Sequence, residues 1–189
     1  HCGRAHEWFL AAQDPAAPER EYFRFDASLP HGYECWFDVP SLPKFDHTSG
    51  RLREALVRDP KAPVRSWLHG DHGLDGWRVD VANMAGRLGS IDVTAEFARD
   101  VRAAMALEGD DLLLVAEHAH DASGDLLGDG WHGTMNYAGF TRQVWSWLLG
   151  PDFHEMFLGV PLEVPVITGQ QAVASWRAFH ARIPWRSLL

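Results

Sequence analysis

Apolar positions in the middle of the chain follow the spacing of helices and strands in turn. One set lies on a single helical face and consists of Phe97, Val101, Ala104 and Met105. Their spacing predicts a helix that begins near Asp92 or Thr94, either of which can cap it. Residues 112–116, LLLVA, form a continuous apolar run, which is typical of a strand buried on both faces in a parallel sheet. A β-branched segment bounded by glycine predicts another strand at residues 74–81.

Further segments extend this alternation of strands and helices. Helical spacing recurs at residues 50–68, with an interruption near Pro60 and Pro63, at residues 142–149 and at residues 170–183, and a third strand is predicted at residues 133–136. The order predicts βα units around a parallel sheet, which fits either a doubly wound α/β sheet or part of a (β/α)8 barrel. The GxGxxG turn of a dinucleotide-binding sheet is missing from the sequence, so the partial barrel is favoured.

The beginning of the chain has a different character. Residues 1–50 show no sustained period and are rich in turn residues and aromatic side chains. Loops of this length are uncommon in compact domains and tend to be functional. We therefore predict a loop-rich segment at residues 1–50 and a partial barrel at residues 51–189.

Composition and charge narrow the choice of partners. The chain has 189 residues, 46% of them apolar, and 17 Lys and Arg against 26 Asp and Glu give a formal net charge of −9. These values predict one globular domain, and the lack of a basic cluster argues against nucleic acid as a partner. The apolar runs are shorter than the roughly 20 residues of a membrane-spanning helix, so we expect a soluble protein without a membrane partner and favour a cytoplasmic location. Cys2 and Cys35 do not make a disulfide framework, and both are expected to be free thiols.

Candidate chemistry gathers at the ends of two predicted strands. Arg78 and Asp80 lie two residues apart, so their side chains point to the same face of one strand. Glu117 directly follows the apolar run, at the strand end where parallel α/β folds collect catalytic groups. Two carboxylates in such different surroundings, one beside an arginine and one at the end of an apolar strand, are typical of a nucleophile and an acid. The spacing alone fits a structural ion pair at a strand end equally well.

Histidines raise the alternative of a metal-dependent hydrolase. The sequence contains 11 of them, including the pair His118 and His120. Zinc requires about three or four ligands from defined elements. Because the other histidines show no ligand spacing, a catalytic metal is disfavoured.

Two segments carry a resemblance to a known family. Residues 73–83, GLDGWRVDVAN, resemble the nucleophile motif of the α-amylase family, glycoside hydrolase family 13, in its neopullulanase and maltogenic-amylase branch. Residues 113–122, LLVAEHAHDA, are similar to the acid/base motif of that family, in which the glutamate is followed by His-Asp-Ala. Weaker similarities lie at residues 133–140, GTMNYAGF, and at residues 42–46, LPKFD. His1 matches the last residue of the family's first motif.

The resemblance implies a role for each matching residue. Asp80 would be the nucleophile, Glu117 the general acid/base, and Arg78 the residue that orients Asp80. The implied substrate-binding residues are His1, Trp77, Asn83, His120, Asn136 and Tyr137. Tryptophans in predicted loops, where a flat aromatic face can stack on a sugar ring, are Trp8, Trp36 and Trp131.

The resemblance also implies an architecture and a function. The chain would hold about the fourth to sixth strands of a (β/α)8 barrel, with residues 1–50 as the loop region that follows the third strand. The implied reaction is retaining hydrolysis of α-glucosidic bonds in malto-oligosaccharides or related α-glucans. The alternatives are a glucosyltransferase or isomerase of the same family and a catalytically silent sugar-binding relative. No organic cofactor is implied, whereas a calcium site and the oligomeric state stay open.

Both ends of the sequence interrupt recognisable patterns, so we expect an internal fragment of a larger barrel. The N-H-D motif that carries the family's third carboxylate does not follow Ile183. The chain as given is therefore expected to be catalytically incomplete. Because an open part of a barrel leaves strand edges unpaired, we also expect the isolated chain to aggregate.

Overall fold

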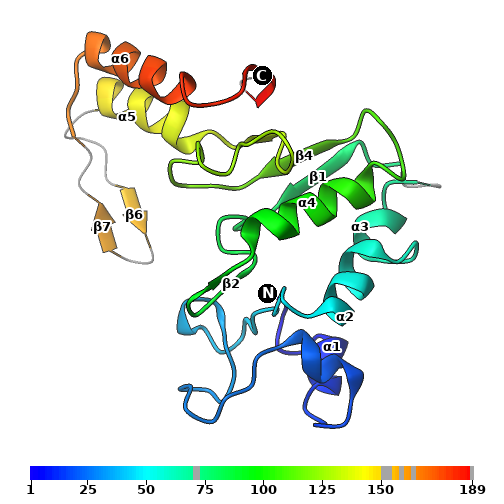
Figure 1. Ribbon diagram of the computed structural model, residues 1–189. Coiled ribbons are helices and arrows are strands. Elements are labelled where there is room, and N and C mark those ends of the chain that lie inside the picture. Colours follow the sequence, from blue (N-terminus) through cyan, green and yellow to red (C-terminus); the bar gives the residue numbers. More distant parts are fainter. Residues whose placement is uncertain (70–72, 150–154, 158–159, 163–164, 188–189) are drawn as a thin grey trace. The chain divides into compact units, whose positions relative to one another are not determined.

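The computed structural model describes residues 1–69, 73–149, 155–157, 160–162 and 165–187 (Figure 1). Contacts divide the chain into two compact units, of which the first holds His1–Trp77 and Val81–Leu114 and the second holds Arg78–Asp80 and Val115–Leu189. The division passes through two strands, so the residues at the carboxyl ends of those strands belong to the second unit. None of the described helices is long and apolar enough to cross a membrane.

A parallel sheet carries the three predicted strands. They are β1 (Gly76–Val79), β4 (Leu113–Ala116) and β5 (Gly133–Thr134), in the order β1-β4-β5. The backbone N–H of Leu113 donates to the carbonyl of Asp75 at 2.9 Å, and four residues later in both strands Glu117 donates to Val79, also at 2.9 Å. Because the hydrogen-bond partners move four residues in the same direction along both strands, β1 and β4 run parallel. Strand β5 is parallel to β4. The carboxyl ends of all three strands therefore meet at one edge of the sheet.

Strand β4 exposes one of its faces, which differs from the expectation. Leu114 and Ala116 are fully buried, whereas Leu113 keeps 54% of its surface exposed. The prediction that this strand is buried on both faces is therefore wrong. The physical reason is that the sheet has three strands within the described residues, and an open sheet covers less of its inner face than a closed barrel does.

The connection from β1 to β4 contains a hairpin and a long helix. The hairpin pairs β2 (Arg87–Leu88) with β3 (Ile91–Asp92) across a turn at Gly89 and Ser90, and Gly89 has a φ of +60°. The sequence analysis missed this hairpin, although glycine followed by serine between short strands is a known signal. Helix α4 (Thr94–Met105) confirms the predicted helix. It begins where Asp92 Oδ1 accepts a hydrogen bond from the backbone N–H of Thr94 at 3.1 Å.

Helical segments before β1 are interrupted as the two prolines predict. They are α2 (Gly50–Arg53), the π-helical turn η3 (Glu54–Arg58) and α3 (Pro63–Ser66). Asp100 Oδ2 on α4 accepts hydrogen bonds from Arg53 at 3.0 Å and from Arg58 at 2.7 Å. Glu108, just after α4, accepts from Arg65 Nε at 2.5 Å. These ion pairs attach the interrupted helical segment to α4.

Residues 1–49 fold into short turns around a shared aromatic core. The regular elements are α1 (Glu7–Ala11), which the sequence analysis missed, and the 3-10 turns η1 (Pro18–Tyr22) and η2 (Trp36–Asp38). Isolated bridges pair Phe23 with Phe45, Phe25 with Tyr33, and Cys35 with Pro43. The ring of Phe9 lies 5.1 Å from that of Phe23 and 4.8 Å from that of Tyr33, both in edge-on geometry. Aromatic packing of this kind supplies a core where the backbone has few regular elements.

Both cysteines are free thiols, as predicted. Cys35 pairs with Pro43 on one side, and the backbone N–H of Cys2 donates to the carbonyl of Pro43 at 3.0 Å. Pro43 therefore lies between the two cysteines. The two cysteines are therefore separated by two strand spacings, about 9–10 Å. A disulfide allows roughly 7 Å at most between the Cα atoms of its cysteines. Burial raises the pKa of Cys2 to about 11, so its thiol stays protonated.

The second unit continues after β5 with helices. Its further elements are η4 (Tyr137–Thr141), α5 (Arg142–Leu148), β6 (Glu155–Phe157), β7 (Val160–Leu162), α6 (Gly169–His180) and η6 (Trp185–Ser187). Helices α5 and α6 confirm two predicted helices and lie side by side (Figure 1). A capping box between Thr168 and Gln171 fixes the start of α6. The rings of Phe140 and Trp176 stack at 5.7 Å between centroids, which holds η4 against α6.

Glycine at position 76 is predicted to be irreplaceable. It has a φ of +153°, and a Cβ atom there would lie 1.9 Å from the carbonyl oxygen of Leu113. Gly76→Ala should therefore lower the free energy of unfolding by roughly 2–4 kcal/mol, measured by urea denaturation. Gly50→Ala is the matched control, because Gly50 has open space around it and begins a helix; its effect should stay within about 1 kcal/mol. Equal effects of the two substitutions would contradict the close approach of β1 and β4.

Acid should destabilise the first unit through His47. This side chain is 5% exposed and packs between Phe45 and Phe97, and its pKa is lowered to about 3, mainly by burial. The unfolded chain takes up a proton near pH 6.5 while the folded one stays neutral, so stability is complete above that pH and falls below it. Between about pH 6.5 and pH 5 the free energy of unfolding should drop by about 2 kcal/mol.

The matched variant for this experiment is His47→Gln, which is neutral at both pH values. Urea denaturation at the two pH values should show the acid loss in the wild type and a smaller loss in the variant. The other histidines are common to both proteins, so their contributions cancel. Parallel losses would mean that His47 is not the cause.

Candidate active site

One guanidinium joins the two predicted carboxylates. Arg78 Nη1 donates a short hydrogen bond to Asp80 Oδ1, and Arg78 Nη2 lies 3.0 Å from Glu117 Oε1. The prediction that Arg78 reaches Asp80 is confirmed. The contact with Glu117 was not predicted, and it places both carboxylates around the same positive group.

The sheet brings these three residues together. Arg78 lies on β1 and Asp80 follows its last residue, so both project from the same face of one strand. Glu117 follows the last residue of β4, and its backbone N–H is held by the carbonyl of Val79. Directly after Asp80 the chain turns at Val81, which has a φ of +45°. A β-branched residue in this conformation is strained, and such strain is concentrated at functional sites.

The two carboxylates have different exposure. The side chain of Asp80 is 62% exposed, whereas that of Glu117 is 26% exposed. Arg78 also reaches Met135, whose Sδ atom lies 3.4 Å from Nε. The hydrogen bond to Asp80 is the main cause of a raised pKa for Arg78, and the charges of Glu117 and Asp80 add to it. The guanidinium is therefore a permanent positive charge between the two acids.

Other predicted residues of the second unit lie along the same sheet edge. Asn136 and Tyr137 follow β5, and Asn136 adopts the left-handed conformation with a φ of +50°. The Oδ1 atom of Asn136 is buried without a hydrogen-bond partner among the described residues, and it fills the space beside Gly139 together with Phe179. His120 is exposed in the loop that follows Glu117.

The remaining predicted residues belong to the first unit. His1 is exposed, and its ring lies 5.8 Å from that of Trp36. Trp77 lies on β1 and donates from its indole Nε1 to the carbonyl of Val64 at 2.9 Å. Asn83 lies in the turn after β1 and is partly buried. Their placement as substrate-binding residues stays a prediction.

Two of the tryptophans considered for sugar stacking have structural roles. Trp131 is 1% exposed, so its faces are covered by protein. Trp8 packs edge-on against Tyr22 at 5.2 Å and Phe45 at 6.0 Å in the aromatic core. The expectation fails for Trp131 because a large apolar ring in a short loop is buried whenever the loop folds back on itself.

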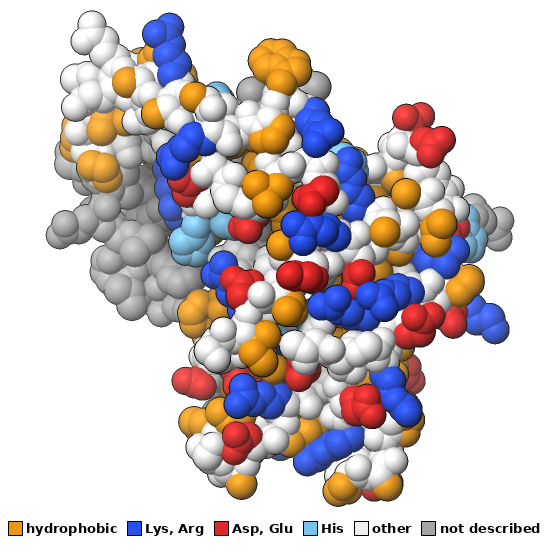
Figure 2. Space-filling model, in the orientation of Figure 1, with side chains coloured by type: hydrophobic (Ala, Val, Ile, Leu, Met, Phe, Trp, Pro, Cys, Tyr) orange, Lys and Arg blue, Asp and Glu red, His pale blue; other side chains and the backbone are white. Residues whose placement is uncertain are grey.

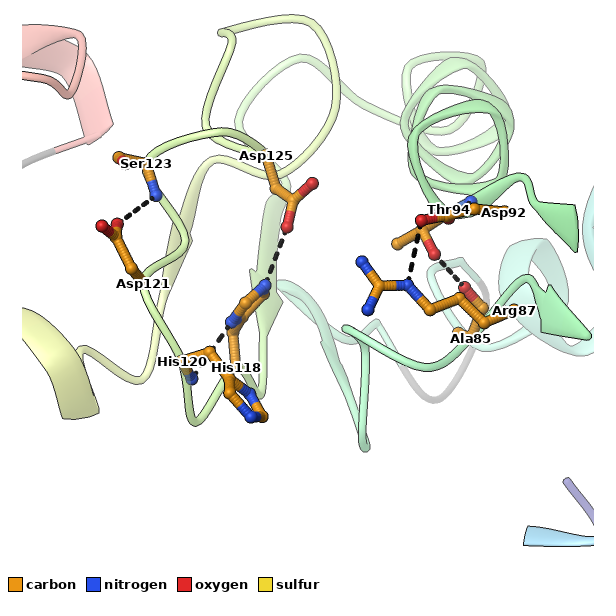
Figure 3. A network of polar contacts seen from close by, with 9 residues as sticks. All are labelled: Ala85, Arg87, Asp92, Thr94, His118, His120, Asp121, Ser123 and Asp125. Atoms are coloured by element: carbon orange, nitrogen blue, oxygen red, sulfur yellow. Dashed lines mark hydrogen bonds and ion pairs between the residues drawn. The ribbon is translucent and has the colours of Figure 1, made fainter. Parts of the chain in front are cut away.

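A contact between a buried histidine and a partly exposed aspartate next to Glu117 was not predicted from the sequence. His118 is 4% exposed, and its Nε2 atom lies 2.8 Å from Asp125 Oδ2 (Figure 3). The backbone N–H of His120 donates to His118 Nδ1 at 3.4 Å. The sequence analysis considered His118 only as a metal ligand. The alternation of β4 was the available signal, because it places His118 on the same face as the buried Leu114 and Ala116.

Among the residues that the structure describes, no group of three or more His, Cys, Asp or Glu side chains is arranged to hold a metal ion. On the face that Figure 2 shows, Lys and Arg side chains are interspersed with Asp and Glu side chains. One exposed ion pair of the chain joins Arg87 to Asp92, whose side chains are 47% and 51% exposed.

The arrangement suits acid/base chemistry with a nucleophile. Asp80 is open to an incoming group, and Glu117 is more covered at the neighbouring strand end. Arg78 holds both acids on one side of the sheet edge. Two carboxylates placed in this way can attack a carbon centre and protonate a leaving oxygen.

Known proteins with similar sequences include an amylopullulanase and a neopullulanase. An amylopullulanase of Thermoanaerobacterium saccharolyticum is 32% identical over 133 residues, which cover 65% of this chain and 10% of that protein. A neopullulanase 2 of Thermoactinomyces vulgaris is 36% identical over 99 residues, covering 52% of this chain and 14% of that protein. No family model matches the chain.

Solved structures agree over almost the whole chain. The cyclic α-maltosyl-(1→6)-maltose hydrolase of Arthrobacter globiformis, in complex with cyclic α-maltosyl-(1→6)-maltose, has a TM-score of 0.73 at 25% identity and covers 98% of this chain. A debranching enzyme of Nostoc punctiforme has a TM-score of 0.73 at 21% identity, a likeness that concerns the fold alone. The predicted fold, part of a (β/α)8 barrel, is confirmed. The chain spans 10% of the amylopullulanase and 37% of the Arthrobacter hydrolase.

Proposed function

We propose that the chain belongs to the glycoside hydrolases of the α-amylase family, and that it supplies the acid/base and nucleophile part of the barrel of an enzyme that hydrolyses α-glucosidic bonds with retention. The observation that carries the proposal is the shared guanidinium of Arg78, which contacts both Asp80 and Glu117. Retaining hydrolysis requires two carboxyl groups about 5–5.5 Å apart. A single arginine between them favours such a short separation.

In the proposed reaction Asp80 attacks the anomeric carbon and forms a glycosyl ester. Glu117 gives its proton to the departing glycosidic oxygen, and afterwards it takes a proton from the water that hydrolyses the ester. The greater exposure of Asp80 supports its role as the attacking group, since the sugar must reach it. The role of Glu117 as the proton donor rests on the similarity of residues 113–122 to the family's acid/base motif.

We assign the substrate as a malto-oligosaccharide or related α-glucan. The names and bound ligands of the relatives support this class of substrate. The relatives include an amylopullulanase, a neopullulanase and a hydrolase of a cyclic maltosyl-maltose. The proposed sugar contacts are His1, Trp77, Asn83, His120, Asn136 and Tyr137. Residues 1–50 would correspond to the loop region that follows the third strand of the barrel, and residues 51–189 to the partial barrel itself.

Separate roles for the two carboxylates can be tested with a pair of substrates in a complete barrel enzyme that includes this chain, because the chain as given is expected to be catalytically incomplete. A maltosyl fluoride needs no proton on its leaving group, whereas a malto-oligosaccharide does. Glu117→Gln should therefore lower kcat on the oligosaccharide by about 10²–10⁴ and spare formation of the glycosyl ester from the fluoride. Asp80→Asn should abolish turnover of both substrates, because the ester can no longer form.

Presteady-state release of fluoride and steady-state release of reducing ends measure the two steps separately. Thermal denaturation of each variant checks that folding is unchanged. Equal losses on both substrates in both variants would mean that the roles are wrongly assigned.

Arginine at position 78 should not be replaceable by lysine. A guanidinium offers separate nitrogens to two carboxylates, whereas an ammonium is a single point charge. Arg78→Lys should lower kcat/KM by roughly 10²-fold, because a small displacement of either acid has a large effect on rate. The matched control is Arg87→Lys in the exposed pair with Asp92, which should stay within about twofold of the wild type. An Arg78→Lys variant with normal activity would show that the proposed reaction does not need the shared guanidinium.

A further inference from the structure

We propose that the buried His118 and the partly exposed Asp125 form a positioning pair that holds Glu117 in the orientation needed for proton donation, an inference that rests on the proposed function. His118 lies on the buried face of β4, and Asp125 contacts it from the loop that follows. Their effect on the reaction would therefore pass through Glu117.

The geometry of β4 places His118 directly behind Glu117. Burial alternates along the strand and continues past its last residue, since Leu114 and Ala116 are 0% exposed and His118 is 4% exposed. Glu117 lies between the two buried positions and points to the opposite face. The imidazole is thus the next buried side chain of the strand, one peptide away from the proposed acid.

Hydrogen bonds fix the imidazole on both sides. Nδ1 accepts from the backbone N–H of His120, so the proton resides on Nε2 and is donated to Asp125 at 2.8 Å. Figure 3 shows the imidazole of His118 pointing toward the carboxylate of Asp125 across the loop. In a neutral histidine one ring nitrogen donates and the other accepts, and here both find partners.

Asp125 is itself anchored. Its backbone N–H donates to the carbonyl of Ala122 at 2.9 Å, and Ala122 and Leu126 are both 1% exposed. The hydrogen bond between His118 and Asp125 therefore connects the end of β4 to a hydrogen-bonded turn that contains two buried residues. A second contact, between Asp121 and Arg182 at 3.1 Å, connects the same loop to the end of α6.

Three constraints consequently act on Glu117. Val79 holds its backbone N–H, Arg78 contacts its carboxylate, and the anchored imidazole of His118 fixes the peptide that follows it. Breaking the pair would leave a buried ring nitrogen without a partner, which costs about 1–3 kcal/mol unless His118 rotates outward. That rotation would turn the peptide between Glu117 and His118 and with it the acid.

The test compares two substrates in a purified complete barrel enzyme that includes this chain, because a loss of folded protein lowers activity on both substrates alike. Asp125→Ala removes the acceptor of the pair. We expect kcat on a malto-oligosaccharide to fall roughly 10- to 100-fold, while the presteady-state rate of fluoride release from maltosyl fluoride, which reports ester formation alone, stays within about threefold of the wild type. Asp125→Asn keeps an acceptor oxygen and should restore most of the activity on the oligosaccharide.

A second disruption keeps the inference testable if Asp125→Ala does not fold. His118→Met retains the buried volume but loses both hydrogen bonds, and it should show the same selective loss. Asp92→Asn is the control, because it removes the charge from the exposed pair with Arg87 in the first unit and keeps an oxygen for the backbone N–H of Thr94, and its two rates should both stay within about twofold.

The outcomes separate this inference from the function it rests on. A complete barrel enzyme that includes this chain and is inactive on both substrates would overturn the proposed function and the inference together. An active wild type with equal losses on both substrates in Asp125→Ala and His118→Met would overturn only the positioning role. A selective loss that Asp125→Asn repairs would support it.

Discussion

The close approach of β1 and β4 is the constraint on which the candidate site depends. A side chain at Gly76 would occupy the position of the Leu113 carbonyl, so the strands can pair at this distance because position 76 lacks a Cβ atom. Pairing then continues to the hydrogen bond between Glu117 and Val79 at the other end. Since strand register decides which side chains are neighbours, one glycine near the start of β1 determines that Arg78 meets Glu117 at its end.

Electrostatics then determine what the strand ends can do. Two carboxylates at one edge would repel each other, and one of them would have to be displaced or neutralised. Arg78 between Asp80 and Glu117 removes that conflict while leaving Asp80 open on its far side. Partial exposure limits what such ion pairs contribute to stability. The arrangement is therefore better explained by a need to orient the acids than by a need to stabilise the fold.

Periodicity in the sequence was sufficient for some parts of this structure and not for others. Arg78 lies on a regular strand, and Asp80 and Glu117 directly follow two of them, so alternation and strand position predicted that Arg78 and Asp80 share a face and that Glu117 lies at a strand end. The contact between Arg78 and Glu117 was not predicted. The aromatic core of residues 1–49 rests on isolated bridges such as Phe23 with Phe45, which leave no period to detect. The pair of His118 and Asp125 depends on how a loop folds back, and local spacing carries no information about that.

Backbone strain is found just after two of the strands that form the candidate site. Among the described residues, four that are not glycine have positive φ, and two of these, Val81 and Asn136, come just after strands β1 and β5. Asparagine tolerates this conformation, but a β-branched valine pays about 1–3 kcal/mol for it. Such a residue persists only where its surroundings enforce it, and hydrogen bonds from Met84 and Ala85 to the carbonyl of Val81 do so. The fold therefore keeps a strained turn directly after Asp80, and orientation of that carboxylate is the benefit that can offset the cost.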